Sequence, residues 1–291
     1  MRKNVKKQLA LRVLSTAALV AMVSSIATAA FAAEYNVAEG SVEIVAKDGS
    51  QSITQWADKD KGTFVKDENG DNIDHRPDSK IVLVTKDETT GETKPTSNTV
   101  TIDAKEGNTA NVTLKDVDIR VDTTKAKSGA IEIKGNGDTN LELNGNNTVL
   151  VENGWEEEHA AIEKADKYGT GTLTIKDDLN DDGSVKDKDE NGNAVGGDTG
   201  KLLAGGYHES AAIGGGAGDL GDTSNITITG GEITAIGGND GGSGIGGGGR
   251  PGGTGKNICI KGNAHVTAAG AEGAAIGGGA SGGNSITITD H

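Results

Sequence analysis

The sequence has very little of the material that usually builds a large core or locks a fold covalently. Only 2% of its 291 residues are aromatic, and it contains 3 prolines and 1 cysteine. Because Cys259 has no second cysteine to pair with, an internal disulfide is excluded. Glycine is abundant, with 47 residues, but it does not follow the three-residue period of collagen. Stability must therefore come from packed aliphatic side chains and backbone hydrogen bonds.

Basic residues are also scarce: 28 lysines and arginines face 43 acidic residues, which gives a formal net charge of -15. Such an anionic chain is a poor partner for nucleic acids and anionic membranes. Residues 1–33 have the pattern of a secretory signal peptide, with a basic start, a short apolar stretch over 13–26 and the small-x-small motif Ala30-Phe31-Ala32. The apolar stretch is too short for a stable anchor. We expect a secreted or cell-surface protein with no membrane span after cleavage.

A phrase of small residues followed by isoleucine and three glycines occurs three times, around Ile213, Ile245 and Ile276. These isoleucines are 32 and 31 residues apart, and a fixed period of this length is typical of repeat architectures. Weaker copies lie at Ala130-Ile131 and Ala161-Ile162. A short apolar-polar-apolar strand alternates with this phrase and occurs six times: Val112-Thr113-Leu114, Leu141-Glu142-Leu143, Leu173-Thr174-Ile175, Ile226-Thr227-Ile228, Ile258-Cys259-Ile260 and Ile286-Thr287-Ile288.

The first residues of these six strands are 29, 32, 53, 32 and 28 residues apart, and a third strand such as Ile233-Thr234-Ala235 follows after a glycine corner. Three short strands per unit of about 31 residues cannot bury a face alone. They can pair with neighbouring units if each unit forms one rung of a coil. The sequence therefore predicts an all-β, right-handed parallel β-helix. The units are too short for the blades of a propeller.

The predicted β-helix has a preceding segment and one interruption. Residues 34–96 contain short strand runs and a turn at Asp67–Gly70, and we expect them to form an N-terminal cap with lead-in strands. Residues 97–291 form the rungs, and the 53-residue interval predicts an acidic insertion at about 177–199. The last strand leaves an open edge. We expect either a partner strand or further C-terminal repeats there, and favour a truncated chain.

The repeated motifs resemble those of a known group of proteins. Ala211-Ala212-Ile213-Gly214-Gly215-Gly216, followed by Asn225-Ile226-Thr227-Ile228-Thr229, resembles the glycine-rich β-helix repeats of secreted and wall-attached bacterial surface proteins. Residues 98–102 and 112–119 resemble the opening rungs of that family, so the likeness covers about 97–289. The resemblance implies a fold similar to that of pectate lyases and a role in carbohydrate binding.

The register also places two aromatic residues at one corner of neighbouring rungs. Trp155 precedes Ile162 by seven residues, and Tyr207 precedes Ile213 by six. An apolar ring face beside hydrogen-bonding carboxylates suits a sugar. We therefore expect a carbohydrate-binding corner made of Trp155, Glu156, Glu158, His159, Tyr207, His208, Asn239 and Asp240. The competing interpretation is a solvated corner with two incidental rings.

A second candidate site lies in the acidic insertion. Its Asp178-x-Asn180-x-Asp182-Gly183 run matches the first half of an EF-hand calcium loop, with Asp189 in place of the final glutamate. Asp178, Asn180, Asp182 and Asp189 are candidate ligands of a calcium ion, although Asx-rich turns have the same sequence pattern without an ion. No other cofactor is required.

The sequence offers little support for catalysis. Arg120 and Arg250 are isolated in the sequence, and the five histidines lack metal-binding spacing, so His159, His208 and His265 are expected at the surface or at corners. The sequence favours a non-catalytic module that binds extracellular polysaccharide or a cell-surface glycan. The alternatives are a structural stalk or adhesin segment and, third, an enzyme of the polysaccharide lyase type.

Overall fold

The computed structural model describes residues 33–155, 158–177 and 200–288. The predicted signal peptide, apart from its last residue, and most of the predicted acidic insertion lie outside these ranges. From Glu34 onward, the described residues belong to one compact unit. Among them, no helix is long and apolar enough to cross a membrane.

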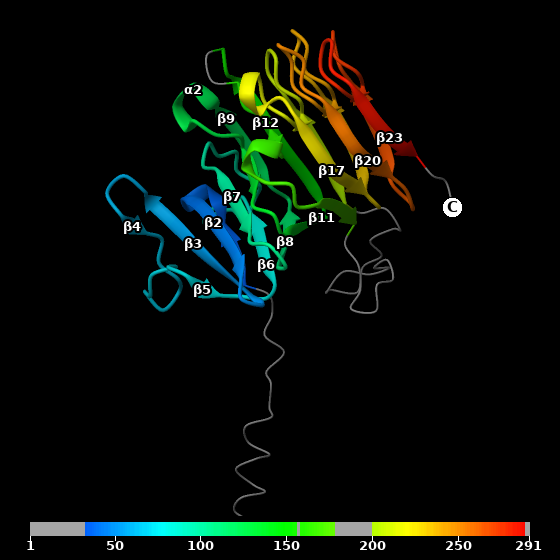
Figure 1. Ribbon diagram of the computed structural model, residues 1–291. Coiled ribbons are helices and arrows are strands. Elements are labelled where there is room, and N and C mark those ends of the chain that lie inside the picture. Colours follow the sequence, from blue (N-terminus) through cyan, green and yellow to red (C-terminus); the bar gives the residue numbers. More distant parts are fainter. Residues whose placement is uncertain (1–32, 156–157, 178–199, 289–291) are drawn as a thin grey trace, which may run out of the picture. The chain divides into compact units, whose positions relative to one another are not determined.

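The chain folds as the predicted parallel β-solenoid, with about 48% strand and about six rungs roughly 32 residues apart. Each complete rung contributes one strand to each of three sheets, and Figure 1 shows β17, β20 and β23 running side by side in the first of these. In spatial order the first sheet contains β1 (Glu34–Asn36), β6 (Ile81–Val84), β8 (Thr109–Lys115), β11 (Asp138–Asn144), β14 (Leu173–Asp177), β17 (Thr223–Ile228), β20 (Gly255–Ile260) and β23 (Asn284–Ile288).

The second and third sheets are built in the same way. The second contains β22 (Ile276–Gly277), β19 (Ile245–Gly246), β16 (Ile213–Gly214), β13 (Ile162–Glu163), β10 (Ile131–Lys134), β7 (Val100–Ala104), β2 (Ser41–Lys47), β3 (Ser50–Asp58) and β4 (Thr63–Phe64), with β5 (Arg76–Pro77) also paired to β3. The third contains β21 (His265–Ala269), β18 (Glu232–Ile236), β15 (Lys201–Gly205), β12 (Asn146–Asn153) and β9 (Asp118–Asp122). The described helical segments are one α-turn, α2 (Thr123–Ala126), and 3₁₀ turns at Val37–Glu39, Asp166–Tyr168 and Gly218–Leu220.

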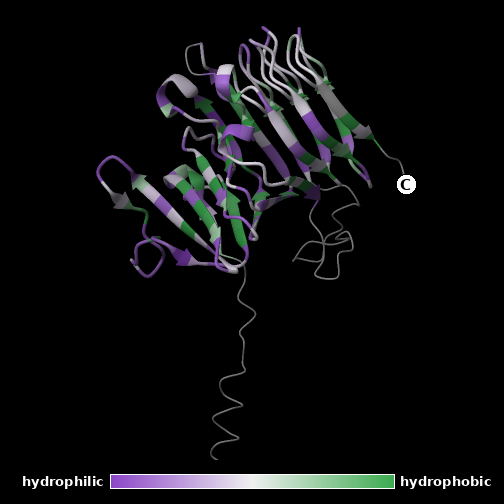
Figure 2. Cartoon of the chain, in the orientation of Figure 1, coloured by the Kyte–Doolittle hydropathy of each residue, from purple (hydrophilic) through white to green (hydrophobic). Residues whose placement is uncertain are grey.

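The core is a set of aliphatic columns that run through the rungs. The repeated isoleucine of the second sheet pairs in register from Ile131 to Ile162, Ile213, Ile245 and Ile276. The first four of these side chains are fully buried. Each buried aliphatic side chain contributes about 1.5–3 kcal/mol relative to an exposed one. Apolar and polar residues alternate along the strands, visible as green and purple bands in Figure 2. Because successive side chains of a strand point to opposite faces, the apolar ones face the core.

The register differs from the sequence-based alignment at one step. Leu141 pairs with Ile175 rather than with Leu173, whose partner is Thr139. Because strand side chains alternate with a period of two, a shift by two residues keeps every inward-facing side chain inward. Leu141, Leu173 and Ile175 are all fully buried in consequence.

The segment 34–96 supplies strands to two of the sheets. β1 and β6 join the first sheet, and β2 pairs in parallel with β7, so that Val42 and Val100 extend the isoleucine column. β3 then folds back antiparallel onto β2. The predicted turn at Asp67–Gly70 is present, closed by a bridge between Lys66 and Asn72.

Three glycines in the second sheet make close stacking possible. Gly214, Gly246 and Gly277 directly follow the repeated isoleucine and have φ of 134°, 135° and 131°. A Cβ atom on Gly246 would lie only 1.8 Å from the carbonyl oxygen of Gly277 on the next rung. Positive φ and this close approach both require glycine.

Candidate functional site

The corner that precedes the second sheet gathers polar and aromatic side chains from successive rungs. Trp155 leads into β13, and its side chain is 65% exposed. Its ring lies against the imidazole of His208 from the next rung, with centroids 4.3 Å apart and planes tilted by 47°. An exposed indole is thus held in place by one neighbouring ring, with much of its surface accessible to a ligand.

His208 is held between two carboxylates. Its Nδ1 lies 2.6 Å from Glu158 Oε1, and its Nε2 lies 3.3 Å from Asp240 Oδ2. His208 and Asp240 both precede the repeated isoleucine of their rungs by five residues, so the register brings them together. The Asp240 N–H also donates to the His208 carbonyl oxygen at 2.9 Å.

Arg250 reaches this corner from the loop after β19. The loop is anchored where the Gly249 N–H donates to the Glu209 carbonyl oxygen. The Arg250 guanidinium then lies 3.1 Å from Asp240 Oδ1 and 3.9 Å from Glu272 Oε2. Arg250, although isolated in the sequence, therefore has two acidic neighbours in the fold, because contacts between glycine-rich loops do not follow the strand period.

The carboxyl group of Glu158 is in an unusual environment. Burial raises its pKa above the ordinary value, the hydrogen bond to His208 opposes that rise, and the charge of Glu209 adds to it. Its Oε2 atom is buried and has no hydrogen-bond partner among the described residues. Glu158, His208 and Glu209 also place donor atoms within 4.8 Å of one another, close enough to share a cation.

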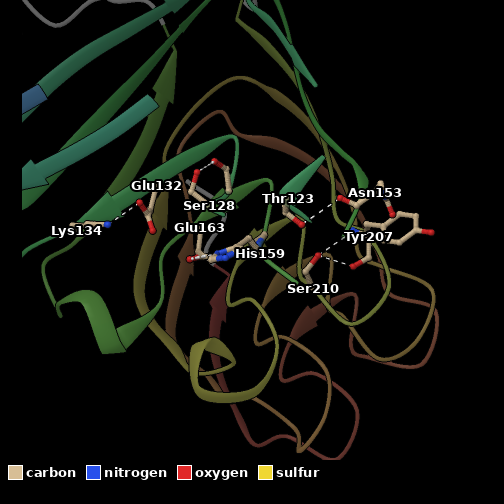
Figure 3. A network of polar contacts seen from close by, with 11 residues as sticks. Thr123, Ser128, Glu132, Lys134, Asn153, His159, Glu163, Tyr207 and Ser210 are labelled. Atoms are coloured by element: carbon tan, nitrogen blue, oxygen red, sulfur yellow. Dashed lines mark hydrogen bonds and ion pairs between the residues drawn. The ribbon is translucent and has the colours of Figure 1, made fainter. Parts of the chain in front are cut away.

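The structure brings four residues of the predicted corner together: Trp155, Glu158, His208 and Asp240. Tyr207 lies in the same loop but packs against the hydrophobic core, and its backbone closes a turn with Ser210, as Figure 3 shows. Asn239 is exposed in a turn, without a described side-chain contact to this group. The remaining predicted site residues, Glu156 and the calcium candidates Asp178, Asn180, Asp182 and Asp189, lie outside the described residues.

His159 belongs to a second polar group on the outer side of the second sheet. Although expected at the surface or at a corner, it is only 6% exposed. Its Nδ1 lies 2.9 Å and 3.1 Å from the two carboxylate oxygens of Glu163, which is fully buried. Glu132, on the adjacent rung, is 4% exposed and lies 2.8 Å from Lys134 Nζ. Figure 3 shows His159 directed at Glu163 and Lys134 directed at Glu132.

This second group was missed by the sequence analysis, although a signal existed. The repeated isoleucine is followed by glutamate in two rungs, at Glu132 and Glu163, and by glycine in the next three. Register pairing then stacks Glu132 directly on Glu163. Two negative charges stacked on neighbouring rungs repel each other unless other groups compensate them. The presence of glutamate at a position that is glycine in the next three rungs therefore indicates a polar site.

No family model, no curated protein and no solved structure matches the chain. The structure supports the β-helix part of the resemblance noted in the sequence, and the carbohydrate-binding part is taken up below as a proposal.

Proposed function

We propose that this protein is a non-catalytic, extracellular or cell-surface β-helix module that binds carbohydrate at the corner formed by Trp155, Glu158, His208, Asp240 and Arg250. The observation that carries the proposal is the exposed indole of Trp155, positioned by His208 and flanked by fixed carboxylates. Sugars alternate apolar C–H faces with hydroxyl groups, and an aromatic face beside hydrogen-bond acceptors matches both surfaces.

The charge of the corner selects among sugars. Four carboxylates, those of Glu158, Glu209, Asp240 and Glu272, lie around one guanidinium and one imidazole. The carboxylates would repel anionic polymers such as polyuronates, whereas neutral hexoses have pairs of hydroxyl groups that can donate hydrogen bonds to carboxylates. The favoured ligand is therefore a neutral extracellular polysaccharide or surface glycan.

The backbone contacts of the corner favour binding as well. The loops carrying His208 and Asp240 are joined by a backbone hydrogen bond, and the loop carrying Arg250 is tied to Glu209 by another. A site built on a rigid scaffold loses little conformational entropy when the ligand binds.

A glycan array followed by titration calorimetry tests the proposal. For the best neutral glycan, Trp155→Ala should weaken binding at least tenfold, which corresponds to about 1.4 kcal/mol. Trp155→Phe should lose less because it retains an aromatic face. Glu232→Gln is the control and should leave glycan binding unchanged, since Glu232 is an acidic residue on the third sheet that pairs with Lys201 and forms no hydrogen bond or ion pair with the described residues of the corner.

Three results would contradict the proposal. If Trp155→Ala binds as tightly as the wild type, the corner is not the site. If the wild type binds no glycan on the array, the protein is better interpreted as a structural stalk or adhesin segment than as a glycan-binding module. If the wild type releases unsaturated products from polygalacturonate, the protein is a lyase rather than a passive binder.

A further inference from the structure

The buried group of Glu132, His159 and Glu163 has the composition of a metal site. One donor atom from each residue lies within 4.8 Å of the other two, and all three residues are more than nine-tenths buried. One imidazole nitrogen and two carboxylate oxygens make a donor set that zinc accepts, with a fourth position for water. Calcium fits less well, because it requires six or more oxygen ligands.

The fold forces these donors together. Glu132 and Glu163 are stacked by the register of β10 and β13. His159 arrives on the strap, defined here as residues 158–160, which crosses the outer side of the same sheet. Glycines make room for the strap: a Cβ atom on Gly129 would lie 2.4 Å from the Ala160 carbonyl oxygen, and one on Gly216 would lie 2.5 Å from that of Glu158.

The distances suit an ion between His159 and Glu163. Ligand atoms around a tetrahedral zinc with bonds of about 2.0 Å lie about 3.3 Å apart. His159 Nδ1 and Glu163 Oε1 are 3.1 Å apart. Zinc can therefore be accommodated by a small outward adjustment of these atoms, while the Glu132 carboxylate closes in from the adjacent rung.

The surroundings resemble the outer shell of a metal centre. In such centres, ligating carboxylates are themselves held by hydrogen-bond donors. Here the Ala160 N–H donates to Glu163 Oε2 at 3.0 Å, and Lys134 Nζ lies 2.8 Å from Glu132 Oε2. Lys134 is in turn placed over the ring of Tyr168, 4.8 Å from its centroid. Each carboxylate thus has one oxygen held by a donor of the protein, and both oxygens of Glu163 lie within 3.1 Å of His159 Nδ1.

We propose that Glu132, His159 and Glu163 bind one zinc ion, which fastens the strap to the second sheet. The inference concerns metal binding alone and stands apart from the proposed carbohydrate function. Because the strap also carries Glu158, the ion would hold one wall of the corner in place.

Zinc titration of the metal-stripped full-length protein tests this site, with calorimetry for affinity and X-ray absorption for the ligands. The wild type should bind one zinc ion at this site, with an imidazole in its coordination shell. His159→Gln should reduce the affinity at least tenfold, and Glu132→Gln, which keeps an acceptor for Lys134, should do the same. His265→Gln is the matched control, because His265 is exposed on β21. His208→Gln separates this site from the group around Glu158.

The outcomes are distinct. Unchanged affinity in folded His159→Gln or Glu132→Gln protein, loss of the site in His208→Gln alone, or a wild-type zinc shell without imidazole would each overturn the proposal. If His159→Gln fails to fold, Glu132→Gln decides; if both fail, the wild-type absorption spectrum decides. As a further readout, zinc should slow hydrogen exchange at the Ala160 amide of the wild type.

Discussion

The glycine at position 246 offers the most direct test of how the rungs stack. In Gly246→Ala the new methyl group would lie 1.8 Å from the Gly277 carbonyl oxygen and 2.8 Å from its carbonyl carbon. Alanine would also have to adopt a φ of 135°. Overpacking costs about 1–3 kcal/mol, and a strained backbone conformation of this kind costs about 1–3 kcal/mol more. We expect the free energy of unfolding to fall by about 2–6 kcal/mol.

Two control substitutions separate the causes. Gly218 has a φ of 58°, and a Cβ atom there would have no neighbouring atom within 4 Å, so Gly218→Ala should cost only the backbone term of about 1–2 kcal/mol. Gly283 lacks a positive φ, and a Cβ atom there would lie 3.9 Å from Thr254 Cγ2, so Gly283→Ala should stay within about 0.5 kcal/mol of the wild type.

Urea unfolding followed by far-UV circular dichroism measures the global effect. Hydrogen exchange adds the local one: the Gly247 N–H, which donates to the Gly277 carbonyl oxygen at 2.7 Å, should lose protection in Gly246→Ala. The reasoning is refuted if Gly246→Ala is no less stable than Gly218→Ala.

Two further predictions concern the core and the pH dependence of stability. Ile213→Ala, in the fully buried middle of its column, should cost about 2–5 kcal/mol, and Ile276→Ala, which is only partly buried, should cost clearly less in the same urea assay; equal losses would contradict the stacked core. The Thr254 N–H and hydroxyl donate to Asp222 at 2.7 Å and 2.8 Å and hold the pKa of its carboxyl group below the ordinary value. The Asp222 carboxylate therefore stabilises the fold above about pH 4, and this contribution disappears as the pH falls through the lowered folded-state pKa. Since Asp222 is exposed, Asp222→Ala should lower the stability by at most about 1 kcal/mol at pH 7 and should have no effect in acid. Thermal melts between pH 2 and pH 7 measure this; a stability difference between variant and wild type that stays constant across that range would contradict the assignment.

Much of the fold was predictable because its core is periodic. The isoleucine column from Ile131 to Ile276 pairs as its spacing indicates. The step from Leu141 to Ile175 was misaligned because Leu173 is an equally apolar residue at the same strand phase, two positions away. The strands of residues 34–96 were harder to place because they lack the repeated phrase, although Val42 and Val100 occupy the same column.

The candidate sites were predictable only in part. The register placed His208 beside Asp240, since both stand at one position of neighbouring rungs. It also put Trp155 at the same corner, but not against His208 in particular, because the conformation of an irregular loop sets that contact. Arg250 was out of reach of such reasoning, since its position depends on backbone contacts between two loops. The burial of Glu163 likewise depends on where the strap crosses the sheet.

The position of Trp155 gives the protein a built-in optical probe. The chain has only two tryptophans. In the other, Trp56, the ring centroid lies 4.5 Å from that of Phe64, and the indole nitrogen is buried. Two such different surroundings should produce separate emission bands, a red-shifted one from water-exposed Trp155 and a bluer one from Trp56. A Trp56→Phe protein would retain Trp155 as its single tryptophan, in contact with His208. Any molecule that covers the corner would then change the wavelength and the intensity of the tryptophan emission, without a label.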